Sequence, residues 1–120
     1  MTAKKQYARI IYWRAKPGLF DAYTRYLQTV VESIDHEAQQ RGSLVSFSTL
    51  VDSRPDAPWS HMRLFVFDSA EQRARMVESL AEANQAITPD ASERTERANQ
   101  AAKLRDRVGE ADLEVLGPAA

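Results

Sequence analysis

Two segments of the chain, residues 6–14 (QYARIIYWR) and 60–67 (SHMRLFVF), have the β-branched and aromatic composition of β-strands. Side chains alternate between the two faces of a strand, and in both segments each face carries large apolar groups. A sheet built around these strands needs cover on both sides, because apolar patches of this size are rarely left in water. The chain is therefore limited to folds in which helices cover one face of a sheet and something else covers the other.

A helix is predicted over residues 19–41, after the first strand. Its apolar side chains recur every three or four residues, as along one side of a helix. They are Phe20, Tyr23, Leu27, Val30, Val31, Ile34 and Ala38. Gly42 supplies the left-handed residue that commonly ends a helix. Residues 44–51 then alternate as a half-buried strand, and residues 52–59, with two prolines and two aspartates, are expected to form a loop.

The second half of the chain predicts two more helices and a last strand. The segment 68–72 (DSAEQ) is a helix-start signature, in which a side-chain oxygen caps free backbone N–H groups. That helix is expected to stop before Pro89, because a proline cannot continue a helix. A third, alanine-rich helix is expected over residues 90–108, ended by Gly109, and a short strand over residues 112–116.

The predicted order is β-α-β-β-α-β with an extra helix before the last strand, an α+β arrangement of the ferredoxin-like type. Right-handed crossovers place the strands at 6–14 and 60–67 side by side at the centre of the sheet. The strands at 44–51 and 112–116 then lie at its edges.

The two faces of the central strands are assigned from their composition. One face is almost wholly apolar, and we expect the helices to cover it; its residues are Ala8, Ile10, Tyr12, Met62, Leu64 and Val66. The opposite face mixes rings with cations, and we expect a second copy of the chain to cover it; its residues are Tyr7, Arg9, Ile11, Trp13, His61, Arg63, Phe65 and Phe67. The result would be a two-fold symmetric homodimer, a dimeric α/β barrel. The alternative is that the helix at 90–108 folds over this second face.

Composition excludes several classes of function. Sixteen basic and seventeen acidic residues give a net charge of -1 with no basic cluster, so neither nucleic acid nor a membrane is an expected partner. The chain has no cysteine, its two histidines lack metal-ligand spacing, and its four scattered glycines form no phosphate loop. We therefore expect no metal and no cofactor.

No signal or membrane-spanning segment is recognisable, so the prediction is a cytoplasmic single domain over residues 1–120, with residues 1–5 and 117–120 as loose termini.

Several short motifs are similar to those of a known superfamily. The sequence resembles the dimeric α/β-barrel superfamily and, within it, the antibiotic-biosynthesis-monooxygenase-like group, through the segments YARIIYWRAKPG, RGSLVSFSTLVDS, LFVFDSAEQRARM and ADLEVLGP. The stretch SHMRLFVFDSAEQR also resembles the NIPSNAP-like branch. The resemblance implies a ferredoxin-like dimer and, among the activities of the group, cofactor-independent oxygenation of aromatic compounds. The haem degradation of other members is not expected, because Phe67 stands where those members have tryptophan.

The candidate site residues are aromatic and polar groups near the central strands. His61 and Tyr23 are the candidate catalytic residues, since an imidazole and a phenol can both move protons. Tyr12, Trp13 and Arg63 are the candidate substrate-binding residues. They suit a small apolar or aromatic molecule, and the resemblance implies that such a molecule would be the substrate of a cofactor-independent monooxygenase. The alternative is a non-catalytic ligand-binding or stress-associated dimer in which the same side chains serve packing and subunit contact.

Overall fold

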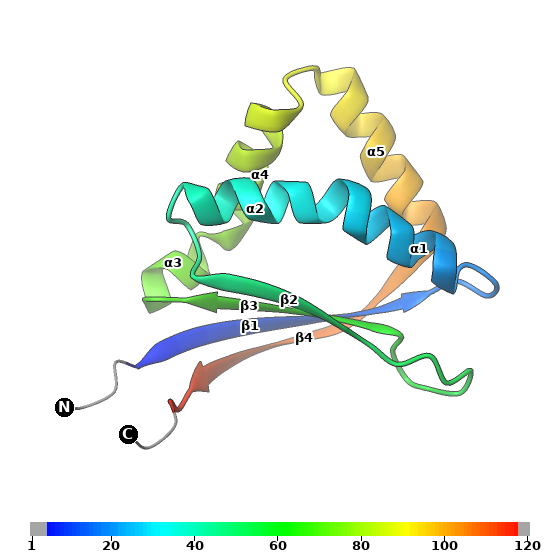
Figure 1. The fold of residues 1–120 in the computed structure, drawn as a ribbon, viewed down its shortest axis with the longest axis horizontal. Coiled ribbons are helices and arrows are strands. Elements are labelled where there is room, and N and C mark those ends of the chain that lie inside the picture. Colours follow the sequence, from blue (N-terminus) through cyan, green and yellow to red (C-terminus); the bar gives the residue numbers. More distant parts are fainter. Residues whose placement is uncertain (1–4, 118–120) are drawn as a thin grey trace.

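The computed structural model describes residues 5–117 and contains a four-stranded antiparallel sheet with all of its helices on one side (Figure 1). Its strands are β1 (Gln6–Ala15), β2 (Ser46–Val51), β3 (His61–Phe67) and β4 (Arg105–Val115). They are ordered β2-β3-β1-β4 across the sheet, so β1 and β3 are central, as predicted. The α+β ferredoxin-like topology is thereby confirmed. Most of the termini predicted to be loose, residues 1–4 and 118–120, lie outside the described residues.

The first helical segment has three parts. It runs from α1 (Phe20–Tyr26) through a π-helical turn, η1 (Leu27–Val31), into α2 (Glu32–Gln40). As predicted, Gly42 follows its end, with a φ of 78° in the left-handed region. The π-helical turn was not predicted, and turns of this kind are frequent beside functional sites.

The second predicted helix is divided into α3 (Ala70–Ala74) and α4 (Met76–Ile87), because Arg75 leaves helical geometry between them. The predicted cap is confirmed: the Ser69 hydroxyl accepts a hydrogen bond from the backbone N–H of Gln72 at 3.1 Å. Within residues 5–117, no helix combines the length and the apolar character needed to cross a bilayer.

The predicted boundary between the third helix and the last strand is wrong. The helix α5 (Ala91–Leu104) is followed directly by β4, so residues 105–108 are strand rather than helix, and the strand begins at Arg105 instead of residue 112. The reason is tertiary: β4 pairs with the whole length of β1, and this pairing outweighs the weak helical pattern of the segment. Gly109 therefore lies inside β4, opposite Tyr12, and the register shifts by one residue at Val108.

The predicted assignment of the two sheet faces is also wrong. The helices cover the face that mixes rings with cations, where Ile11, Phe65 and Phe67 form the core with residues of the helices. The polar members of this face find partners there: Arg63 forms an ion pair with Asp35 of α2. Burial of this face is therefore compatible with its charges, because the helices supply the opposite charge and the hydrogen bonds.

The face that the helices leave open is the almost wholly apolar one. Its central residues, which are Ile10, Tyr12, Met62, Leu64 and Val66, are only half-buried, and Leu50 and Leu113 on the edge strands remain 45% and 46% exposed. The helix α5 lies with the remaining helices on the side of the ring-and-cation face (Figure 1), where Ala98 and Ala101 line one hollow with Trp13. The alternative, in which the helix predicted at 90–108 folds over that face, therefore agrees with the position of α5.

Candidate functional site

A cavity of about 270 Å³ lies between the sheet and the helices, and we call it the cleft. Side chains of β1 and β3 line it from the sheet, side chains of η1, α2 and α4 line it from the helices, and the first residue of β4 completes it. The lining residues are Ile11, Trp13, Val31, Ile34, Asp35, Arg63, Phe65, Leu80, Ala81, Asn84 and Arg105. Seven of these eleven side chains are apolar, so the four polar ones determine what the cleft can recognise.

A buried ion pair joins the sheet to the helices inside the cleft. Arg63 Nη2 of β3 donates to Asp35 Oδ2 of α2, and both side chains are almost completely buried. The guanidinium of Arg63 also lies over the Phe65 ring, 5.0 Å from its centroid. Burial raises the pKa of the Asp35 carboxyl above its ordinary value, and the Arg63 charge opposes that rise. The pair thus holds a base of increased strength next to a fixed cation.

Two polar atoms of the cleft are buried without a hydrogen-bond partner in the described part of the chain. They are the Nε donor of Arg63 and the Oδ1 acceptor of Asn84 on α4. A buried polar atom without a partner costs about 1–3 kcal/mol, and native proteins contain few of them. A donor and an acceptor in one apolar cavity are therefore suited to a ligand that offers the complementary acceptor and donor.

A second arginine lies at the Trp13 end of the cleft. The guanidinium of Arg105 lies 3.7 Å from the centroid of the Trp13 ring, which is a close cation–π contact. Its Nη1 donates a 2.8 Å hydrogen bond to the hydroxyl of Tyr23 on α1. Tyr23 is fully buried, and burial raises the pKa of its hydroxyl, so it meets Arg105 as a neutral phenol.

His61 is buried behind Tyr23, at 4.5 Å between ring centroids. The Thr24 hydroxyl donates to the Phe20 carbonyl, so its oxygen accepts from His61 Nε2 at 2.8 Å. The other ring nitrogen, Nδ1, lies 2.8 Å from the Ser60 hydroxyl, which serves as its donor. The geometry thus assigns a neutral imidazole protonated on Nε2, and burial lowers the pKa of His61 to about 4.

The structure separates the five candidate residues into three places. Trp13 and Arg63 line the cleft. Tyr23 and His61 do not line the cleft: Tyr23 accepts a hydrogen bond from Arg105, which does line it, and His61 packs against the Tyr23 ring. Tyr12 lies on the open face of the sheet, where its ring is 5.7 Å from that of Trp59.

Three cleft residues were missed from the sequence, namely Asp35, Asn84 and Arg105. Asp35 had a signal, because it follows Val31 by four residues and precedes Ala38 by three, which places a carboxylate on the apolar side of its helix. Arg105 had none, since the residue was expected inside a helix.

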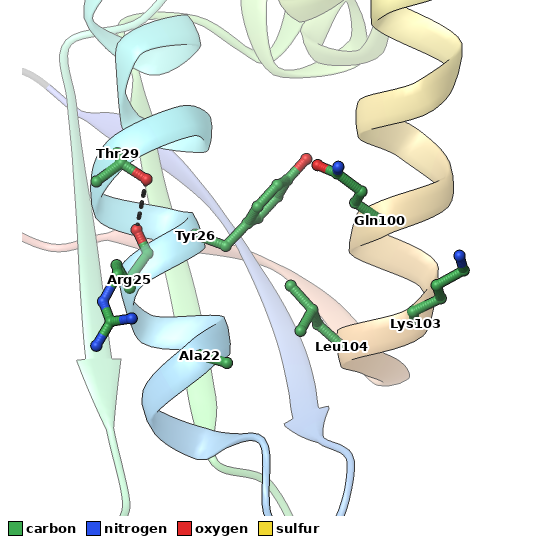
Figure 2. A pocket seen from close by; sticks show the side chains of 7 residues that line it. All are labelled: Ala22, Arg25, Tyr26, Thr29, Gln100, Lys103 and Leu104. Carbon is green, nitrogen blue, oxygen red and sulfur yellow. Dashed lines mark hydrogen bonds between the residues drawn. The ribbon is translucent and has the colours of Figure 1, made fainter.

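A second hollow, of about 420 Å³, lies outside the core between α1, η1 and α5 (Figure 2). Figure 2 shows Tyr26 reaching across it toward Gln100. The two hydroxyl groups that line this hollow already donate hydrogen bonds within the protein: Thr29 donates to the Arg25 carbonyl and Tyr26 to the Arg97 carbonyl. None of the unpartnered buried atoms found in residues 5–117 belongs to this hollow. The cleft is therefore the better candidate, although it is the smaller space.

Comparison with known proteins identifies relatives in structure alone. No family model matches the sequence, and no curated protein matches it. The crystal structure of HapK from Hahella chejuensis is similar with a TM-score of 0.61 at 17% identity, over 95% of this chain and 96% of that one. A putative antibiotic biosynthesis monooxygenase from Chloroflexus aurantiacus has a TM-score of 0.57 at 20% identity, over 96% of this chain and 97% of that one. The chain has the ferredoxin-like fold of these proteins.

An uncharacterized NIPSNAP-like domain protein from Burkholderia xenovorans has a TM-score of 0.56 at 16% identity, over 97% of this chain and 87% of that one. Both branches named in the sequence comparison are thus represented, and the predicted resemblance is confirmed as one of fold. A shared fold leaves the reaction open, so the function has to be argued from the cleft.

Proposed function

We propose that the chain binds a small, largely apolar aromatic molecule in the cleft and oxygenates it without a cofactor. The observation that carries this proposal is the pair of buried atoms without a hydrogen-bond partner in residues 5–117, Arg63 Nε and Asn84 Oδ1, on two residues that line one mostly apolar cavity. At about 270 Å³ the cleft is close to the lower end, about 300 Å³, of common ligand pockets. A putative antibiotic biosynthesis monooxygenase has a similar fold, so oxygenation is the reaction class that we test first.

The buried ion pair supplies the acid–base chemistry in this proposal. An activated methylene of the substrate, next to a carbonyl group, gives its proton to the Asp35 carboxylate, whose pKa burial raises. Arg63 then faces the new substrate anion instead of Asp35, so the total charge of the cleft stays the same. The anion reacts with O₂ to a peroxide anion, which takes the proton back from Asp35 and then loses water, so that one methylene and one O₂ become one carbonyl and one water and Asp35 is ionised again. An apolar cavity favours this step because it excludes bulk water from the anion.

Oxygen uptake with anthrone as substrate tests the reaction. Asn84→Ala is the informative variant, because Asn84 Oδ1 has no hydrogen-bond partner within residues 5–117, so its removal breaks no hydrogen bond of that atom and should not lower the free energy of unfolding by more than about 0.5 kcal/mol. We expect uptake by the wild type and a reduction of about tenfold in Asn84→Ala, the effect of one hydrogen bond to the substrate. Gln85→Ala, on the exposed side of the same helix, is the matched control and should behave as the wild type.

The same assay tests the residues predicted from the sequence to be catalytic. In the proposal, Tyr23 and His61 act by holding Arg105 and do not touch the substrate. Anthrone is neutral and offers Arg105 no anionic group, so Tyr23→Phe should leave both KM and kcat for anthrone nearly unchanged. A large fall in kcat would instead indicate that Tyr23 is catalytic, as predicted from the sequence.

A non-catalytic binding protein is the second candidate, and Trp13 allows the two to be separated. The chain has two tryptophans, and only Trp13 lines the cleft. In a Trp59→Phe variant, fluorescence therefore reports on the cleft alone. Quenching by anthrone without oxygen uptake would favour binding without catalysis. Absence of both signals would reject the cleft as a functional site.

We also propose that the open sheet face joins two copies of the chain. The proposal rests on its continuous apolar surface, which spans β2, β3, β1 and β4 and includes Leu50, Leu64 and Leu113. Surfaces of this kind are usually covered, and a sheet face that is exposed in every copy is most simply covered by the same face of another. The proposal keeps the homodimer that was predicted from the sequence, but the two copies now meet through the apolar face instead of the face that mixes rings with cations.

A further inference from the structure

The charges that line the cleft do not balance. Its lining contains one carboxylate, Asp35, and two guanidinium groups, Arg63 and Arg105. Arg63 and Asp35 neutralise each other in a buried ion pair. Arg105 is half-buried and, within residues 5–117, forms no ion pair. One positive charge at the Trp13 end of the cleft is thus without a counter-charge.

The carboxylates nearest to Arg105 along β4 are engaged elsewhere. Asp106, the next residue, lies 4.0 Å from Lys16 Nζ. Glu110 forms a 2.6 Å ion pair with Arg107. The surplus charge of Arg105 is therefore a property of the folded strand, and neither of these two carboxylates is placed to cancel it.

The contacts of Arg105 hold its guanidinium in place and leave donors free. One face of the group lies on the Trp13 ring, and Nη1 donates to the Tyr23 hydroxyl. A guanidinium has five N–H donors in one plane, of which this hydrogen bond uses one. A planar cation fixed by a ring and a phenol is well suited to a carboxylate, which it can bind through two parallel hydrogen bonds.

We propose that the ligand of the cleft is an aromatic monoanion whose carboxylate binds Arg105 while its ring system lies in the apolar part of the cleft. The inference rests on the proposed function, since it takes the cleft to be the binding site, and it adds the charge and the orientation of the ligand. The anionic group lies at the Trp13 end, and the opposite end of the molecule faces Arg63 and Asn84. Tyr23 is a positioning residue in this arrangement, because it acts through Arg105.

A pair of probes with the same shape tests the proposal. 2-Naphthoate and 2-naphthamide differ in charge and scarcely in size, and binding of each to the Trp59→Phe protein is measured by Trp13 fluorescence. We expect naphthoate to bind at least about tenfold more tightly, as for a charge-assisted, bidentate contact. Arg105→Gln should remove this preference and leave naphthamide binding nearly unchanged. Arg107→Gln removes the same formal charge from the same strand and should keep the preference.

The outcomes separate this inference from the proposed function. Equal affinity of the two probes for the wild-type cleft would overturn the anion inference and leave the cleft as a site for neutral molecules. No binding of either probe would overturn both. Should melting curves show that Arg105→Gln does not fold, Tyr23→Phe provides the second measurement. It should lower the preference for naphthoate severalfold by releasing Arg105, and an unchanged preference would also count against the inference.

Discussion

The buried histidine predicts a specific loss of stability in mild acid. His61 is fully buried, and in its hydrogen-bond chain Nδ1 accepts from Ser60, so a second ring proton would require the Ser60 hydroxyl to turn its own proton away. Burial lowers the pKa of His61 from its usual value near 6.5 to about 4 in the folded chain. The unfolded chain binds a proton at higher pH than the folded chain does. The contribution of His61 is therefore fully present above pH 6.5 and is lost as the pH falls toward 4.

The magnitude follows from the difference between the two pKa values. Each pH unit between them costs about 1.4 kcal/mol, so the free energy of unfolding should fall by about 2 kcal/mol between pH 7.5 and pH 5. The full loss, reached near pH 4, is about 3 kcal/mol. These values are a substantial fraction of the stability of a domain of this size.

Urea unfolding at pH 7.5 and pH 5 measures the effect, with His61→Gln as the variant. Glutamine does not titrate, so the fall attributed to His61 should disappear in the variant, whatever its stability at pH 7.5. The raised pKa of Asp35 acts in the opposite direction in this range, but it is present in both proteins and cancels in the comparison. His36→Gln makes the same substitution on an exposed side chain and should keep the fall. Parallel losses in the wild type and His61→Gln, or an NMR titration of His61 near pH 6.5, would refute the reasoning.

Three further predictions concern the sheet face, a helix cap and the buried ion pair. Leu64→Glu should convert dimers to monomers in light scattering, whereas Val77→Glu, on the exposed side of α4, should not; a dimeric Leu64→Glu protein would contradict the proposed interface. Ser69→Ala should lower the free energy of unfolding by about 1 kcal/mol through loss of the cap of α3, and an unchanged melting curve would argue against it. Asp35→Asn should cost about 3–5 kcal/mol, because it leaves the charge of Arg63 buried and unpaired. A double variant with Leu at position 35 and Met at position 63 should recover most of that loss, and failure to recover would show that packing matters more than charge.

The order of strands and helices could be predicted from the sequence because it depends on local patterns. The change from alternation to a three-to-four-residue spacing gave the first helix, and Ser69 gave the start of the second. The end of α5 could not be predicted in this way. Residues 105–108 become strand because their segment pairs with β1, ninety or more residues away in the sequence, although their own pattern favoured a helix.

The site could be predicted only in part, for a related reason. Trp13 and Arg63 stand out as a large ring and a cation on a central strand, and both line the cleft. Arg105 lines the cleft only because it is the first residue of β4. A prediction that places Arg105 inside a helix therefore does not recognise it as a cleft residue. Nothing in the sequence around Asn84 distinguishes it from other polar residues of a helix. It stands out only in the fold, where its Oδ1 is buried without a hydrogen-bond partner in residues 5–117.

The error in the sheet faces shows how such a choice can be made from physical chemistry. Both faces are apolar enough to need cover, so hydrophobicity does not decide between them. What decides is that Arg63 and His61 can be buried only where partners exist for their polar atoms, and helices can bring such partners from a distance in the sequence. The first helix carries Thr24 and Asp35 on its buried side, and these are the partners that the structure shows. The face with the buried polar groups is therefore the helix face, and the almost wholly apolar face is the one that another copy of the chain can cover.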